Sequence, residues 1–279
     1  KRARTGGPGR DAWYTPEIGQ ETRERTHLLH SLHAAFEQER LFVAYQPQVD
    51  LTTRKPVGFE ALMRWRDDKG NFIPPDRFIP LAEQSGLING MGLWVLHSSL
   101  RVLRRVHEAG WTGLRMAVNV SVVQFQSPEF VAQVADALRE SGIPPNLVEL
   151  EITESVAMAN PTEVEARLQE LKAIGVTVAI DDFGTGFSSL SYLDRLPIDR
   201  LKIDRSFINN IGNGEDGARI TEMVIALGHK LDLTIIAEGI EDEGQIAHLS
   251  RLGCHEGQGY LFARRMPADD LGKWLHDNA

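Results

Sequence analysis

The stretch LFVAYQPQVDLTTRKPVGFEALMRW, residues 41–65, holds two strand-like runs, LFVAYQPQVDL and PVGFEALMRW, separated only by TTRK. Parallel strands need a crossover connection of roughly a dozen residues or more, whereas antiparallel strands can be joined by a short turn. TTRK is too short for a helical crossover. The stretch therefore predicts that the first two strands pair in antiparallel fashion.

Strand-like runs alternate with helical stretches through the rest of the chain. The further runs are LRMAVNVS (114–121), LVELEITES (147–155), VTVAIDDFG (176–184), DRLKIDRS (199–206), LTIIAEGI (233–240) and a short last run near GQGYLF (257–262). This alternation is typical of α/β proteins with a mostly parallel sheet. A length of 279 residues is sufficient for one such barrel. We predict an α/β fold, a modified (β/α)8 TIM barrel with an antiparallel first strand.

The composition is that of an ordinary soluble globular protein, with 42% hydrophobic and 25% charged residues. No apolar run approaches the roughly 18 residues that suggest a membrane span. We expect no membrane contact by this segment, although a longer parent protein could be membrane-anchored. The net charge of −9 disfavours a polynucleotide partner. The single cysteine, Cys254, excludes an internal disulfide and a cysteine-rich zinc site, and it fits a cytoplasmic location.

The chain begins with a basic, glycine-rich segment, KRARTGGPGR. We expect residues 1–26 to be a linker or a remnant of fragment excision, and residues 27–279 to form the barrel domain. Apolar residues at helical spacing predict a helix within residues 21–40 that leads into the barrel. His27, His30 and His33 fall along this helix. Without carboxylate partners they indicate a partly solvated helix face rather than a metal site.

Polar side chains recur at or just past the carboxyl ends of the predicted strands. They are Glu60, Asn119, Glu151, Asp181, Asp182, Lys202, Asp204, Glu238 and Gln258. One polar residue in such a place is usually a turn former. In a (β/α)8 barrel, however, the carboxyl ends of all strands converge at one mouth, where catalytic groups gather. The repetition across seven strands therefore predicts a single site at the mouth.

Residues two apart in a strand share a face, which refines this set. Arg64 shares a face with Glu60, and its guanidinium is expected either to hold a phosphate or to form a salt bridge at the rim. Lys202 and Asp204 share a face, which would place an ammonium and a carboxylate in the same site. Glu154 does not share the face of Glu151. It is expected to support a neighbouring loop or, alternatively, to be a solvated glutamate.

Asp181 and Asp182 are adjacent and would normally point to opposite faces. Both reach one site only if the strand ends there, and the glycines of DDFGTG would permit such a turn.

Charge indicates what fills the mouth of the barrel. The mouth would hold five carboxylates, those of Glu60, Glu151, Asp181, Asp182 and Glu238. They repel one another in a cavity of low dielectric, and one lysine cannot offset their charge. Oxygen ligands without histidine or cysteine favour hard divalent ions such as Mg²⁺ or Mn²⁺. Two such ions can activate a water and stabilise the attacking and leaving oxygens of a phosphodiester. Metal-dependent phosphodiester hydrolysis is therefore the leading predicted chemistry.

These residues resemble the EAL-domain family, bacterial phosphodiesterases that hydrolyse cyclic di-GMP. The resemblance runs from about residue 28 to the C-terminus, and Glu60, Ala61 and Leu62 spell the family's name. It is carried by the ordered motifs YQPQVDL, GFEALMRW, FIPLAEQSGLI, NVS, ELEITES, AIDDFGTGFSSL, LKIDRSFI, IIAEGIE and GQGYLF. Members of this family fold as a modified barrel with an antiparallel first strand, in agreement with the spacing argument.

The resemblance also implies a role for each matching residue. The implied metal ligands are Glu60, Asn119, Glu151, Asp181, Asp182 and Glu238, and the implied catalytic residues are Lys202, Glu238 and Glu60. The implied substrate contacts are Arg64, Asp204, Gln46 and Gln258. Glu154 is expected to anchor the loop that follows Asp182. Lys202 would orient the nucleophilic water, and Glu238 would act as general base or as a metal or water ligand. The implied cofactors are two divalent cations, Mg²⁺ or Mn²⁺, with Ca²⁺ expected to bind without supporting catalysis.

The implied activity is hydrolysis of cyclic di-GMP to linear pGpG. The implied partners are cyclic di-GMP, a second copy of the chain contacting through the loop after Asp182, and an upstream regulatory domain of the GGDEF type. Two alternatives stay open, a receptor and a lyase. The domain could bind cyclic di-GMP as a receptor without cutting it. Carboxylates with a lysine also suit a Mg²⁺-dependent lyase of the enolase type. DFG at 182–184 is a kinase motif, but no glycine-rich loop, VAIK or HRD accompanies it.

Overall fold

The structure, a computed structural model, describes residues 16–158, 160–184, 190–211 and 215–278. Helix α1 (Pro16–Glu37) leads into the barrel and is continuous across residue 26, where we placed the start of the barrel domain. No helix in the described ranges combines the length and the apolar character needed to cross a membrane.

The strands form one nine-stranded sheet that closes on itself. They are β1 (Leu41–Asp50), β2 (Pro56–Arg66), β3 (Phe72–Ile73), β4 (Arg115–Val120), β5 (Val148–Thr153), β6 (Thr177–Phe183), β7 (Arg200–Ile203), β8 (Thr234–Glu238) and β9 (Glu256–Gln258). The order is β1-β9-β8-β7-β6-β5-β4-β2-β3, and β1 also pairs with β2, which closes the barrel. Strand β3 is a short addition outside this ring of eight.

Strand β1 is antiparallel to both of its neighbours, β2 and β9, whereas the remaining neighbours in the ring are parallel. The short connection between β1 and β2 leaves no room for a helical crossover, so the chain reverses directly. The predicted fold class, a modified (β/α)8 barrel with an antiparallel first strand, is therefore confirmed.

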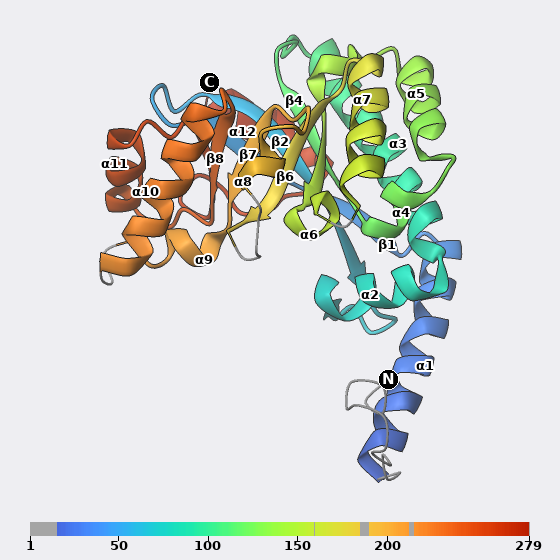
Figure 1. Cartoon of the computed structure of the whole chain (residues 1–279). Coiled ribbons are helices and arrows are strands. Elements are labelled where there is room, and N and C mark those ends of the chain that lie inside the picture. The colour runs from blue at the N-terminus through green and yellow to red at the C-terminus, as the bar shows by residue number, and fades with distance from the viewer. Residues whose placement is uncertain (1–15, 159, 185–189, 212–214, 279) are drawn as a thin grey trace, which may run out of the picture.

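Helices surround the barrel (Figure 1). Those after α1 are α2 (Pro75–Ser85), α3 (Leu87–Glu108), α4 (Val122–Gln126), α5 (Phe130–Ser141), α6 (Glu154–Ala157), α7 (Pro161–Ile174), α8 (Leu190–Leu193), α9 (Arg205–Ile208), α10 (Glu215–Lys230), α11 (Glu243–Arg251) and α12 (Ala268–Asn278), with a 3₁₀ turn η1 at Pro145–Leu147. In Figure 1, α3, α5 and α7 cover one side of the barrel, α10 and α11 cover another, and α1 projects away beside α2.

The apolar core has two parts. The larger lies between the strands and the surrounding helices, and the smaller joins α1 and α2 to the end of β2. In the smaller part, Leu32 and Ala35 of α1 are fully buried with Trp65 and Phe78, whose rings meet edge to face at 5.7 Å. Buried aromatic pairs of this kind stabilise a contact beyond their area alone. This second core holds β2 at Trp65, one residue beyond Arg64.

The last strand is shorter than the predicted run at 257–262. Strand β9 ends at Gln258 because the chain then crosses closely over Ile240. A Cβ atom at Gly259 would lie 2.1 Å from the carbonyl oxygen of Ile240, so only glycine fits. The Ile240 N–H donates to the Gln258 carbonyl at 3.1 Å, and the Leu261 N–H donates to the Ile240 carbonyl at 3.1 Å. This crossing ends the strand directly after the residue that faces the site.

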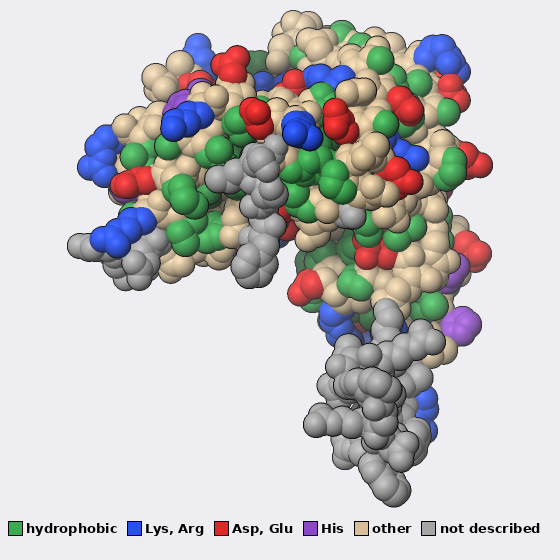
Figure 2. Space-filling model, viewed as in Figure 1, with side chains coloured by type: hydrophobic (Ala, Val, Ile, Leu, Met, Phe, Trp, Pro, Cys, Tyr) green, Lys and Arg blue, Asp and Glu red, His purple; other side chains and the backbone are tan. Residues whose placement is uncertain are grey.

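Basic and acidic side chains are interspersed over the face shown in Figure 2, with hydrophobic side chains between them.

The helix that leads into the barrel carries His27, His30 and His33, and all three are exposed. The one cluster of potential metal ligands found among the described residues lies inside the barrel and does not include these histidines.

Candidate metal centre

The ammonium of Lys202 lies at the centre of the barrel mouth, surrounded by carboxylates. Its Nζ is 2.7 Å from Glu238 Oε1, 2.8 Å from Glu151 Oε1, 3.3 Å from Asp181 Oδ1 and 3.7 Å from Glu60 Oε1. The Lys202 side chain is fully buried. Strand ends that are far apart in the sequence therefore meet at one point, as the pattern of polar strand ends predicts.

The register of the strands explains this meeting. Asn119 is level with Glu151 on the neighbouring strand, and Glu238 is level with Gln258. Gln46 of β1 lies directly opposite Glu60 of β2. Because side chains alternate along each strand, level positions on neighbouring strands point to the same side of the sheet. The two side chains of each of these pairs therefore point to the same side of the sheet.

Carboxamides hold the carboxylates in place. Asn119 donates to Glu60 Oε1 at 2.7 Å, and Gln258 donates to Glu60 Oε2 at 2.6 Å and to Glu238 Oε1 at 3.1 Å. Gln258 in turn accepts a hydrogen bond from Gln48 at 3.2 Å. Hydrogen bonds to a charged acceptor are stronger than neutral ones, so they fix Glu60 in its ionised form.

Burial and mutual repulsion shift the protonation of this cluster. Burial raises the pKa of Glu151 well above its usual value, raises that of Asp181, and raises the pKa of Glu238 to about 8. Burial also acts on Glu60, but Lys202 and the two carboxamides outweigh it and lower the pKa of that carboxyl. Burial opposes the charge of Lys202, yet the four carboxylates hold its pKa well above the usual range. The lysine stays charged, and the carboxylates compete for too little positive charge.

This donor set fits a metal ion. Glu60, Glu151 and Asp181 each offer an oxygen, and these oxygens lie within 4.8 Å of one another. Both oxygens of Glu151 are buried, and its Oε1 is paired with the Lys202 ammonium at 2.8 Å. An all-oxygen, carboxylate-rich cluster suits a hard divalent cation. The cluster could therefore hold such an ion.

Asp182 reaches the same cavity as Asp181 because the backbone bends between them. The φ angle of Asp182 is +54°, in the left-handed region, and the pairing of β6 with β7 shifts register between Ile180 and Phe183. Aspartate visits this region more readily than most residues. The sequence predicts that the strand ends there and that glycines supply the turn, whereas β6 continues to Phe183 and the backbone bends at Asp182 itself. Burial and Asp181 raise the pKa of Asp182 to about 6.

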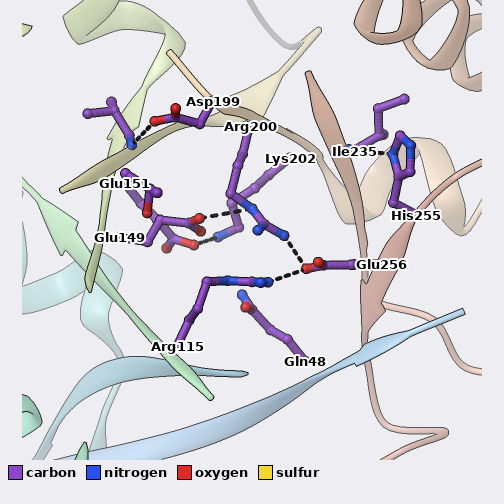
Figure 3. A network of polar contacts seen from close by, with 12 residues as sticks. Gln48, Arg115, Glu149, Glu151, Asp199, Arg200, Lys202, Ile235, His255 and Glu256 are labelled. Atoms are coloured by element: carbon purple, nitrogen blue, oxygen red, sulfur yellow. Dashed lines mark hydrogen bonds and ion pairs between the residues drawn. The ribbon is translucent and has the colours of Figure 1, made fainter. Parts of the chain in front are cut away.

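A second polar layer, the lower layer, lies two residues toward the starts of β5, β7 and β9, and Figure 3 shows it next to Glu151 and Lys202. It consists of Glu149, Arg200, Glu256 and Arg115. Arg200 Nε lies 2.9 Å from Glu149 Oε2, Arg115 Nη2 lies 2.6 Å from Glu256 Oε2, and Arg200 also pairs with Glu256. Two guanidinium groups here face two carboxylates, so this layer is balanced in charge.

The other predicted site residues take distinct places. The main cavity, of about 650 Å³, opens at the barrel mouth beside Glu60 and Asp181. Arg64 lines this cavity, is half-buried, and donates from Nη1 to the Met63 carbonyl at 2.7 Å. Strand β7 ends at Ile203, so Asp204 leaves the alternation that would place it beside Lys202. It begins α9 instead, accepting from the backbone N–H of Ser206 at 3.0 Å.

Glu154 is 3% exposed, so it is not a solvated glutamate. Its Oε2 accepts the backbone N–H of Gly184 at 2.9 Å, at the start of the loop that follows Asp182. Residues 185–189 of this loop, through which we expect a second copy to bind, lie outside the described residues.

Sequence reasoning missed two groups of residues. Gln48 and the lower layer could have been found from the alternation, because Glu149, Arg200 and Glu256 each precede a site residue by two positions on the same strand. Arg265 lines the main cavity but follows β9 in irregular chain. No strand or helix pattern in the sequence singles it out.

The fold and the site together define an α/β barrel with an acidic cluster, able to hold a metal ion, at the carboxyl ends of its strands. The chain matches the EAL domain family over residues 29–265. It belongs to that family, as the motifs predict.

Characterised relatives cover nearly the whole chain. It is 42% identical over 259 residues to the bifunctional diguanylate cyclase/cyclic di-GMP phosphodiesterase MucR of Pseudomonas aeruginosa, covering 93% of this chain and 38% of that protein. It is 38% identical over 263 residues to the cyclic di-GMP phosphodiesterase NbdA of the same species, covering 94% of this chain and 34% of that protein. The chain thus spans roughly a third of the length of these relatives.

Solved structures share the fold. The phosphodiesterase PaMucR, in a c-di-GMP complex, is similar with a TM-score of 0.85 and 44% identity, covering 88% of this chain and 99% of that chain. The EAL domain of Mycobacterium smegmatis DcpA is similar with a TM-score of 0.74 and 36% identity, covering 85% of this chain and 98% of that chain.

Proposed function

We propose that this domain hydrolyses cyclic di-GMP to linear pGpG. The observation that carries the proposal is the buried cluster of Glu60, Glu151, Asp181 and Glu238 around Lys202, in a chain that belongs to the EAL family. MucR and NbdA, which are named as cyclic di-GMP phosphodiesterases, support the substrate. A cavity of about 650 Å³ lined by Glu60, Asp181 and Asp182 gives the substrate access to these carboxylates.

The residues that would hold divalent ions, Mg²⁺ or Mn²⁺, form two overlapping sets. Glu60, Asn119, Glu151 and Asp181 would hold one ion; Asp181 would bridge to a second, held by Asp182 and assisted by Glu238. Two such ions, when bound, activate a water and stabilise the attacking and leaving oxygens of an in-line displacement. Asp181 and Asp182 both line the main cavity because β6 bends between them, and this supports the arrangement. Ca²⁺ would bind the same oxygens at a different geometry without supporting turnover.

The protein groups bind, orient and move protons. Lys202 would orient the attacking water, because its ammonium is fixed by four carboxylates. Glu238, whose pKa burial raises to about 8, would accept the proton of that water or hold the water in place. Gln258 would keep Glu60 and Glu238 aligned through the two hydrogen bonds it donates. Attack at phosphorus breaks one bond from phosphorus to a 3′ oxygen, which leaves with a proton as the 3′ hydroxyl of pGpG.

The substrate contacts follow the same scheme. Arg64 would bind a phosphate from the cavity wall, and Gln46, which lies opposite Glu60, would contact the substrate beside it. Asp204 would contact a guanine edge at the start of α9. Glu154 would support the loop after Asp182 through its hydrogen bond to Gly184. That loop would form a dimer surface in a second copy of the chain.

The setting of the domain is also a proposal. We infer a cytoplasmic domain of a longer signalling protein, with residues 27–279 as the catalytic barrel and residues 1–26 as its connection to an upstream domain. MucR, whose name includes a diguanylate cyclase, supports an upstream domain of the GGDEF type.

The test is product analysis. The purified domain is incubated with cyclic di-GMP and Mg²⁺ or Mn²⁺, and the products are separated by chromatography, with an EDTA control. Metal-dependent pGpG is the expected result. Tight binding of cyclic di-GMP without product would favour the receptor alternative, and absence of both binding and product would overturn the proposal.

A further inference from the structure

Two cavities lie at the mouth of the barrel and share one wall. The larger, of about 650 Å³, extends toward α2, and the smaller, of about 190 Å³, extends toward α9. Glu60, Leu62 and Arg265 line both cavities. The shared wall therefore carries one anionic side chain, which belongs to the metal centre, and one cationic side chain, Arg265, to which the proposed function gives no role.

The backbone holds Arg265 in this wall. The next residue, Met266, pairs with Tyr45 of β1: the Tyr45 N–H donates to the Met266 carbonyl at 2.8 Å, and the Met266 N–H donates back at 2.9 Å. Arg265 Nε then donates to Gln46 Oε1 at 3.3 Å. Gln46 is itself buried and opposite Glu60 in the register. The exposed Arg265 side chain is thus directed by this hydrogen bond to Gln46, beside the metal centre.

Arg64 and Arg265 both line the larger cavity, and among the ion pairs that join described residues none includes either of them. Burial and the charge of Arg265 lower the pKa of Arg64 to about 10. Arg64 is half-buried and Arg265 is exposed. Their guanidinium groups line the same cavity and repel each other, and an anion between them offsets that repulsion. Guanidinium groups bind phosphate oxygens in a bidentate geometry.

We propose that Arg265, together with Arg64, binds the phosphodiester group of the cyclic dinucleotide that is not cut, and so determines specificity for a substrate with two phosphates. The inference rests on the proposed function. A cyclic dinucleotide has two nucleoside arms joined through two central phosphates. With one arm in each cavity, both phosphates lie at the shared wall. One then meets the metal centre at Glu60, and the other meets Arg265.

The experiment compares steady-state kinetics of cyclic di-GMP hydrolysis for the wild type, Arg265→Ala, Arg265→Lys and Arg264→Ala. Arg264 is the matched control, because its guanidinium lies over the Tyr260 ring at 5.2 Å and it is not among the residues lining either cavity. Loss of a charged hydrogen-bond pair predicts that Arg265→Ala raises KM about 10- to 100-fold while kcat changes by less than about threefold. Arg265→Lys should recover part of the loss, and Arg264→Ala should behave as the wild type.

A merely structural role would disturb Gln46 and Glu60 and lower kcat instead. A KM for Arg265→Ala within about twofold of the wild type, or a loss confined to kcat, would overturn the inference while leaving the proposed function intact. If the wild type shows no turnover, the proposed function fails, and calorimetric titration with cyclic di-GMP in Ca²⁺ decides the inference. A dissociation constant at least about tenfold weaker for Arg265→Ala would support it. Equal affinity, or no binding by the wild type, would overturn it.

Discussion

Two polar layers lie inside this barrel, and they differ in whether their buried charges are balanced. Figure 3 shows the lower layer together with Glu151 and Lys202 of the upper one. In the lower layer, Arg200 and Arg115 face Glu149 and Glu256, so every charge has a partner. In the upper layer, four carboxylates surround the single ammonium of Lys202. The layers are two residues apart on the same strands, as Glu149 and Glu151 on β5 show.

The difference teaches which layer is structural and which is functional. A buried charge is costly unless it is paired and hydrogen-bonded, so a balanced layer is compatible with stability alone. An excess of buried carboxylates has no such explanation, and it is the arrangement expected of a group that could hold cations. The predictions below test this contrast, from the largest expected effect to the smallest.

Loss of Lys202 or Glu60 in the upper layer should remove activity while leaving the fold. We expect Lys202→Ala or Glu60→Ala to lower kcat for cyclic di-GMP by at least on the order of 10³-fold, because a fixed charged group at the reacting atoms is lost. Turnover is measured as pGpG formation, and circular dichroism reports the fold. Wild-type turnover in either variant would contradict the roles assigned to these residues.

Breaking the lower layer should have the opposite outcome, with stability lost first. Arg200→Met leaves Glu149 and Glu256 buried with one fewer cation, and removing one partner of a buried pair costs about 3–5 kcal/mol of the free energy of unfolding. Urea unfolding of the metal-free protein measures this change. The control is Arg139→Met, whose side chain is 72% exposed beside Asp136, and which should change stability by less than about 0.5 kcal/mol. Equal effects of the two variants would refute the structural role of the lower layer.

Neutralising equivalent glutamates in the two layers should change stability with opposite signs. Glu151→Gln removes one of the repelling carboxylates, so the metal-free domain should gain about 1 kcal/mol, or about 2–4 °C in Tm, while losing activity. Glu149→Gln deprives Arg200 of a partner and should lower Tm. Thermal unfolding in EDTA measures both. A lower Tm for Glu151→Gln would show that the upper layer is not strained by its excess charge.

The pH dependence of metal-free stability should report the upper layer. The folded pKa of Glu238 is about 8 and that of Asp182 about 6, both above their usual values of 4.5 and 3.8. An acid with a raised folded pKa contributes stability that is fully present below its unfolded pKa and is lost as the pH rises through its folded pKa. The metal-free domain should therefore become less stable between about pH 5 and 8.

Divalent ions compensate the ionised carboxylates, so the increase in Tm on adding Mg²⁺ or Mn²⁺ should be about 2–4 °C larger at pH 8 than at pH 6. Glu238→Gln is the control, since it removes the group that titrates near pH 8 and should reduce this difference. A Tm increase that is the same at both pH values in the wild type would contradict the assignment.

The sequence by itself determined the architecture and most of the upper layer. The short TTRK connection implies an antiparallel first pair, and the alternation of strand and helix patterns implies the barrel. Glu60, Glu151, Lys202 and Glu238 could be singled out because the position of a residue in its own strand is a local property, visible in the sequence. The strand ends of a barrel all converge, so local positions were enough to predict that these groups meet.

Only the tertiary structure decided the rest. The left-handed backbone at Asp182, the pairing of Arg200 with Glu256 across 56 positions, and the place of Arg265 beside Gln46 across 219 positions depend on register, bulges and closure of the barrel. These features are set by packing between distant segments, and a pattern within one segment carries no information about them. The same packing decides that one layer of charge is balanced and that the layer above it carries an excess of carboxylates suited to cations.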